Sequence, residues 1–237
     1  PQVPGGLALL DEGGRTFTVV GYDADGYKSV IDAADLDLEY DENLVRLERE
    51  GSAVRAVPVA AGSGLITVSV QGHKAVIPFV SGMRTTPVEA LAQQTLWTFE
   101  RHPAQVIGSV APAAGPDGGA AVALHYTFGP AEGNRAAYLQ AVTPIPLPGR
   151  PDRIGLWVKG DGQGVWLRAV LQDAAGASHT VDLAPAVDWT DWRYVEAAVP
   201  SCAAYPLSLY RIYPVETDAA RSYSGTLAFA HLTVKPA

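Results

Sequence analysis

Three stretches in the second half of the chain place aromatic rings near side chains that form hydrogen bonds, at a spacing of two residues or a multiple of two. In a strand this spacing puts them on one face, because successive side chains alternate. The C–H face of a pyranose can stack on an aromatic ring, while Arg and Gln bond its hydroxyls. The pattern therefore predicts ligand-facing sets suited to a sugar, and the alternative is sandwich core covered by arginines. The residues are Trp166, Arg168 and Gln172 in one stretch, Tyr138 and Gln140 in another, and Arg211 and Tyr213 in a third.

The stretch around Trp166 shows the strand pattern most clearly. Residues 154–168 read IGLWVKGDGQGVWLR, two alternating runs on either side of a Gly-containing connection, which predicts a β-hairpin. One face of each run is aliphatic, and the opposite face of the second run carries Trp166 and Arg168. Such strands pack the aliphatic face on a second sheet and leave the mixed face partly open. We expect a ligand on that open face.

Bulk properties exclude several classes of partner. The chain has 237 residues, a formal net charge of −8 and a pI near 5.0, so it has no broad basic surface for nucleic acid or anionic membrane. No run approaches the roughly 18 apolar residues of a membrane helix, so we expect no membrane insertion. The single cysteine, Cys202, excludes an intrachain disulfide, and we interpret it as a small buried apolar side chain. The chain begins with Pro1 rather than Met, which we interpret as the mark of a processed or excised piece.

Residues 1–82 consist of short alternating runs separated by turns. Turns are expected at 23–26 (DADG), 62–64 (GSG) and 71–73 (QGH). About seven short strands within some 80 residues predict an immunoglobulin-like sandwich. The motifs RTFTVVGYDADG, LDLEY and GLITVSVQGHKAVIPFVSG resemble those of bacterial Ig-like domains. The resemblance implies that this part is a spacer.

A second domain is predicted after a linker. Residues 83–94 lose the alternation and contain a proline, which favours a linker. Residues 95–237 contain eight or nine predicted strands, which favours a jelly roll. Within them, 101–119 is expected to be a surface excursion and 144–151 a loop. The predicted fold class is all-β, an Ig-like sandwich followed by a jelly-roll sandwich.

The second half also resembles a known kind of module. The segments LHYTFGPAEGNRAAYLQ, IGLWVKGDGQGVWLR, VDWTDWRYVEAAVP, LYRIYPVETD and GTLAFAHLTV resemble the galactose-binding-like jelly roll at the C-terminus of bacterial phosphodiester glycosidases. The resemblance implies a non-catalytic accessory region that binds a glycan, with the catalytic domain elsewhere in the same polypeptide. It also implies an extracellular or cell-envelope location in a bacterium.

We expect no cofactor. A structural calcium ion is the less favoured alternative. Modules of this kind hold calcium with a carboxylate in a late F-D-D-I-like strand and a group near an early F-E. Phe99 and Glu100 fit the early motif, but Ala230 and His231 stand at the late one and supply no carboxylate.

Some conspicuous residues have a structural interpretation. We expect Trp189 and Trp192 to form a hydrophobic corner, and Asp161 to form a turn.

Three functions remain open at this point. The favoured one is a non-catalytic module that binds a cell-envelope or extracellular glycan for a linked glycosidase domain. The first alternative is a scaffold that orients the parent enzyme without binding sugar. The second is a free-standing glycan hydrolase, which would need two carboxylates facing each other across a cleft.

Overall fold

The computed structural model describes residues 8–10, 14–60, 62–81 and 86–236. Within them the regular structure is β-strands and three short 3-10 helices, so the all-β prediction is confirmed. The chain divides into two compact units, the first containing Pro1–Arg84 and the second Thr85–Gly115 and Ala120–Ala237. Each unit consists of two sheets around its own apolar core.

The first unit has two four-stranded sheets, ordered β1-β8-β7-β4 and β3-β2-β6-β5. Its core includes Val19, Val54, Val68 and Phe79, all fully buried. Its elements are β1 (Ala8–Leu10), β2 (Arg15–Tyr22), β3 (Lys28–Ile31), η1 (Ala33–Asp35), β4 (Asp37–Glu39), β5 (Val45–Glu50), β6 (Ala53–Pro58), β7 (Gly62–Val70) and β8 (His73–Ser81).

Two of the three predicted turns in this unit are confirmed. The Asp23 carboxylate accepts hydrogen bonds from the backbone N–H groups of Asp25 (3.0 Å) and Tyr27 (2.9 Å), which closes the β2–β3 hairpin. Gln71 and Gly72 both have positive φ (48° and 80°), as a tight hairpin turn between β7 and β8 requires. The third prediction is wrong, because 62–64 lies inside β7 and pairs with β8.

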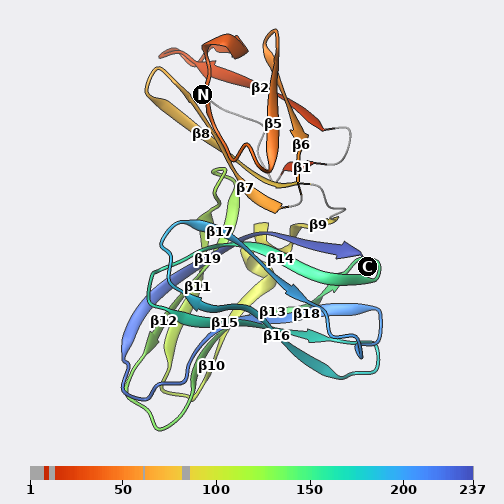
Figure 1. The fold of residues 1–237 in the computed structure, drawn as a ribbon. Coiled ribbons are helices and arrows are strands. Elements are labelled where there is room, and N and C mark those ends of the chain that lie inside the picture. The colour runs from red at the N-terminus through yellow and green to blue at the C-terminus, as the bar shows by residue number, and fades with distance from the viewer. Residues whose placement is uncertain (1–7, 11–13, 61, 82–85, 237) are drawn as a thin grey trace. The chain divides into compact units, whose positions relative to one another are not determined.

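The second unit is a sandwich of two larger sheets, seen as two layers in Figure 1. One sheet has five strands in the order β10-β13-β18-β15-β16. The other has six, with β11-β12-β19-β14-β17 in order and β9 paired to β19. The elements are β9 (Thr86–Val88), η2 (Glu89–Ala92), η3 (Gln94–Leu96), β10 (Trp97–His102), β11 (Ile107–Ala114), β12 (Ala120–Phe128), β13 (Arg135–Leu147), β14 (Pro151–Lys159), β15 (Val165–Gln172), β16 (Ser178–Val187), β17 (Trp192–Ala198), β18 (Leu207–Glu216) and β19 (Tyr223–Pro236).

The predicted hairpin at 154–168 is wrong in its pairing. Both strands form, but β14 lies between β17 and β19, whereas β15 lies between β18 and β16. The connection pairs elsewhere: the N–H groups of Gly160, Gly162 and Gly164 donate to the carbonyls of Asp191, Trp189 and Val187. These bonds carry the chain from one sheet to the other instead of turning it back.

The expected linker contributes to the second unit. Strand β9 pairs with β19, Leu91 is 1% exposed within the core, and the Trp97 indole donates to the Ala90 carbonyl (3.0 Å). Two other expected loops contain strands. Residues 107–114 form β11, paired with β12, and 144–147 continue β13. Their Ala and Pro residues hide the alternation, since strand periodicity is visible only where apolar and polar side chains differ.

Three single-residue interpretations can be compared with the structure. Trp189 is buried and donates to the Val158 carbonyl (3.1 Å), which confirms its part of the predicted corner, whereas Trp192 is half-buried. Asp161 accepts from the Gln163 N–H (3.1 Å) in the connection and from the Tyr126 hydroxyl (2.5 Å), so it shapes the turn. Cys202 is exposed rather than buried, because it lies in a turn between β17 and β18.

Candidate ligand-binding site

One face of the five-stranded sheet carries all seven predicted ligand residues. The aliphatic partners that alternate with them, such as Leu139 and Leu167, are fully buried in the core between the sheets. The strand register brings the other side chains together: Gln140 lies opposite Arg211, and Arg168 lies opposite Tyr213. Three stretches far apart in sequence therefore form one continuous surface.

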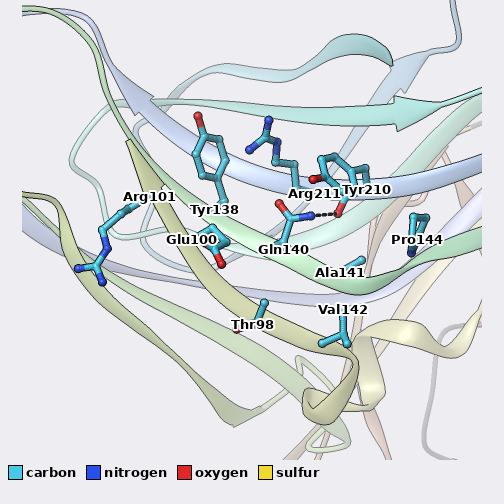
Figure 2. Close-up of a pocket in the computed structure, with 10 residues that line it drawn as sticks. All are labelled: Thr98, Glu100, Arg101, Tyr138, Gln140, Ala141, Val142, Pro144, Tyr210 and Arg211. Carbon is cyan, nitrogen blue, oxygen red and sulfur yellow. Dashed lines mark hydrogen bonds between the residues drawn. The ribbon is translucent and has the colours of Figure 1, made fainter. Parts of the chain in front are cut away.

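A hollow of about 650 Å³ lies on β10, β13 and β18, at one end of this surface. Three of the predicted residues, Tyr138, Gln140 and Arg211, line it. Figure 2 shows them projecting from neighbouring strands. The complete lining consists of Thr98, Glu100, Arg101, Tyr138, Gln140, Ala141, Val142, Pro144, Tyr210 and Arg211. The hollow thus combines aromatic rings with two guanidiniums, an amide and a carboxylate.

The aromatic side of the hollow is built on Tyr138. The guanidinium carbon of Arg211 lies 4.0 Å from the centre of the Tyr138 ring and 5.2 Å from that of Tyr210. The Tyr213 ring, just outside the lining, is centred 5.0 Å from the Tyr138 ring. Burial raises the pKa of the Tyr138 phenol although Arg211 acts in the opposite sense, so the hydroxyl is neutral and can donate near pH 7.

A local irregularity of β18 positions Tyr210 and Arg211. Leu209 and Ile212 are both fully buried although they are three residues apart, and the register shifts beside them. The side chains of Tyr210 and Arg211 can therefore both point away from the core, as happens at a β-bulge. The Gln140 amide makes one long contact, 3.5 Å, to the Tyr210 carbonyl, drawn as a dashed line in Figure 2.

The residues around Trp166 lie on the same face but outside the hollow. The Arg168 guanidinium pairs with Asp182 of β16 (2.8 Å), and the Trp166 indole donates to the same oxygen (3.1 Å). The guanidinium also stacks on the Trp166 ring, 4.2 Å from its centre. Gln172 lies farther along β15, opposite Ser208 and Ser178. Trp166, Arg168 and Asp182 form a closed cluster that the structure itself satisfies.

Four residues at or beside the candidate site were not assigned to it from the sequence. Thr98 and Glu100 alternate with the buried Trp97 on β10, so the same two-residue rule could have found them. Tyr210 could not be found this way, because the bulge breaks the alternation. Asp182 could not be found either, because its contact with Arg168 depends on the pairing of β15 with β16.

The first residue of β13 anchors the strand that carries Tyr138 and Gln140. Arg135 is 1% exposed, and its guanidinium donates to the carbonyls of Gly129, Arg221 and Asp218, each at 2.6 Å. These carbonyls belong to two loops, one after β12 and one after β18, so one buried cation joins the start of β13 to both loops.

Metal binding has no support in the part of the chain that the structure describes. There, no group of three or more His, Cys, Asp or Glu side chains could hold a metal ion. Within the same residues, no helix has the length and apolar character needed to cross a membrane.

Comparison with known proteins gives structural neighbours only. No protein-family model matches the chain, and no curated protein matches it. Among solved structures, it is similar to the family 11 carbohydrate-binding module of the cellulosomal cellulase Lic26A-Cel5E of Clostridium thermocellum. That similarity has 12% identity and a TM-score of 0.44, and covers 66% of this chain and 97% of that one.

Two further neighbours are of the same kind. A structure described under the promiscuous specificity of carbohydrate-binding modules from the β-sandwich superfamily has 12% identity and a TM-score of 0.47, covering 98% of this chain and 94% of that one. TmCBM61 in complex with β-1,4-galactotriose has 17% identity and a TM-score of 0.36, covering 64% of this chain and 95% of that one. These neighbours are carbohydrate-binding modules, and with TM-scores this low the ligand of the present chain has to be inferred from its own residues.

Proposed function

We propose that the second unit is a non-catalytic module that binds a glycan in the hollow on β10, β13 and β18. The observation that carries this proposal is the convergence of Tyr138, Gln140 and Arg211 in one hollow. The Tyr138 ring offers an apolar surface for stacking by a sugar ring. Arg211 and Gln140 supply donors for hydroxyls and Glu100 supplies an acceptor, which is the mixed chemistry that a polyhydroxylated ligand needs.

Binding is favoured over hydrolysis by the carboxylates present. Hydrolysis by paired carboxylates needs two acidic side chains flanking the scissile bond. Among the residues lining the hollow, Glu100 is the one carboxylate. The hollow therefore supports a binding role better than it supports a free-standing hydrolase.

The wider setting is part of the same proposal. The resemblance to accessory regions of bacterial phosphodiester glycosidases supports a linked catalytic domain in the same polypeptide, outside the cell or in its envelope. The first unit, an Ig-like spacer in this proposal, would separate the two. Holding a glycan weakly in the hollow would raise the concentration of substrate near the catalytic domain.

The scaffold alternative rests on one specific observation. Trp166, Arg168 and Asp182 satisfy one another, as side chains with a structural role do. Under this alternative the whole face stabilises the sheet, and both units orient the parent enzyme without binding sugar.

The test is affinity electrophoresis in native gels containing one polysaccharide each, with neutral and acidic plant, algal and bacterial polymers in parallel. We expect at least one polymer to retard the chain and Tyr138→Ala to abolish the retardation, because the stacking surface is lost. The control is Tyr27→Ala, which removes a tyrosine 74% exposed on the first unit and should leave retardation unchanged.

Two results would count against the proposal. Retardation by no polymer would favour the scaffold. Equal retardation of the wild type and Tyr138→Ala, with thermal melts showing both folded, would place the binding site outside the hollow.

A further inference from the structure

Arg211 lines the hollow without a carboxylate partner. Several other arginines of the described residues pair with a carboxylate, among them Arg168 with Asp182 at 2.8 Å and Arg221 with Glu216 at 2.7 Å. Arg211 forms no ion pair with an Asp or Glu side chain of the described residues. Its Nε is buried with no hydrogen-bond partner. Its guanidinium stacks on Tyr138 and Tyr210.

Arg211 lacks a carboxylate partner although acidic residues outnumber basic ones in this chain. The sequence has 25 Asp and Glu against 17 Lys and Arg. Partial burial of a charge is costly unless an opposite charge or hydrogen bonds compensate it, and cation–π stacking offsets only part of that cost. The carboxylate in the lining, Glu100, lies on β10 opposite Tyr138, and β13 separates it from the strand of Arg211.

The stack also fixes the position of the guanidinium. Its central carbon lies over the Tyr138 ring, 4.0 Å from the ring centre, and both residues line the hollow. Figure 2 shows the guanidinium beside the Tyr138 ring on the same side of the sheet. A guanidinium held in this way presents a planar fork of donors that matches a carboxylate or sulfate group in a bidentate arrangement.

We propose that Arg211 is the subsite for an anionic substituent, so that the glycan bound in the hollow is acidic and carries carboxylate or sulfate groups. This proposal rests on the proposed glycan-binding function. The anion supplies the charge that Arg211 lacks, while the sugar ring to which it is attached stacks on Tyr138. A neutral glycan leaves the guanidinium uncompensated, and it therefore binds more weakly.

The experiment is quantitative binding of the full chain to an array of matched pairs. Polygalacturonate is printed beside its fully methyl-esterified form, and ι-carrageenan beside its desulfated form, so that each pair shares a backbone and differs in charge. Alginate, hyaluronan, heparan sulfate, β-glucan, galactan and mannan widen the range. The variants are Arg211→Gln, which removes the charge, and the control Arg193→Gln.

Arg193 is a matched control because it is also an arginine stacked on an aromatic ring. Its guanidinium carbon lies 4.6 Å from the Trp189 ring centre, on β17 of the other sheet. Any effect common to both variants reports the loss of a positive charge in general rather than the loss of the subsite.

We expect acidic glycans to bind more tightly than their neutral partners. Loss of a bidentate, charge-assisted pair should weaken binding of the acidic glycan by roughly 10- to 100-fold in Arg211→Gln, with no change in Arg193→Gln. Raising the salt concentration should also weaken binding of the acidic glycan by the wild type, because salt screens the charge pair. The pair that shows the difference identifies the group as carboxylate or sulfate.

The other outcomes overturn the proposal in distinguishable ways. Equal or tighter binding of the neutral partners leaves glycan binding intact and refutes the anionic subsite. Full-strength binding of acidic glycans by a folded Arg211→Gln refutes the role of this residue. Silence of the wild type on every glycan refutes the proposed function together with the subsite.

Discussion

Replacement of Arg135 by Met should destabilise the second unit selectively. Methionine retains an unbranched apolar stem that can pack against Phe128, over which the Arg135 guanidinium lies at 6.0 Å from the ring centre. It removes all three hydrogen bonds to the carbonyls of Gly129, Arg221 and Asp218. The segments that meet at the start of β13 then lose their common partner.

The size of the effect follows from these contacts. A typical intramolecular hydrogen bond contributes about 1 kcal/mol net, and bonds to charged groups contribute more. The three carbonyls lie on loop residues with partial exposure, so water can replace some of the lost bonds, and removing a buried charge recovers some desolvation energy. We therefore expect a loss of about 3 kcal/mol, or a fall in Tm of roughly 6–12 °C for a unit of this size.

Tryptophan fluorescence restricts the assay to the second unit. All five tryptophans, at positions 97, 157, 166, 189 and 192, belong to it. Urea or thermal unfolding followed by tryptophan fluorescence therefore reports on this unit. The control is Arg150→Met, at an exposed arginine that stacks on Tyr205, with an expected change below about 0.5 kcal/mol. A loss no larger than that of the control would refute the idea that Arg135 joins the three segments.

Three further predictions concern the same unit. Asp173 accepts bonds from His179 and from the N–H groups of Ala204, Ala177 and Ala175, which together lower its pKa to about 2. The contribution of Asp173 to stability should be complete above the unfolded pKa, near 4, and be lost as the pH falls from about 4 to 2; acid titrations of wild type and Asp173→Asn should converge across that window. Gly160→Ala should destabilise the unit strongly in urea melts because a Cβ there would overlap the Trp189 carbonyl oxygen, whereas Gly129→Ala, with open space around the new methyl group, should not. Replacing Trp166 and Arg168 together by Ala should leave retention on the polysaccharide that retards the wild type unchanged, because both side chains lie outside the hollow and bond to Asp182; lost retention by a folded double variant would contradict binding confined to the hollow.

The sheet face that carries the candidate site could be predicted from the sequence, whereas the strand pairing could not. Alternation decides which side of a strand a residue occupies, and it placed Trp166, Arg168 and Tyr138 correctly on the face away from the core. The Gly-rich connection at 160–164 is a local hairpin signal, but its N–H groups bond to the chain at 187–191. Whether the connection closes a hairpin or pairs with residues 187–191 is decided by tertiary structure, which a local motif does not encode.

Within the site, the same distinction separates what was found from what was missed. Tyr138, Gln140 and Arg211 were identified because each shares a strand face with another suitable side chain. Tyr210 reaches the hollow through a bulge. The pairing of Arg168 with Asp182 depends on which strand lies beside β15. The unpaired state of Arg211, on which the anionic subsite rests, likewise becomes visible only once every neighbour is in place.

The most direct test of the central claim is an NMR titration of ¹⁵N-labelled chain with an oligosaccharide of the polymer that retards it. The account predicts that the side-chain N–H signals of Gln140 and Arg211 and the backbone amides of β10, β13 and β18 around the hollow shift most. Shifts confined to the six-stranded sheet or to the first unit would contradict it.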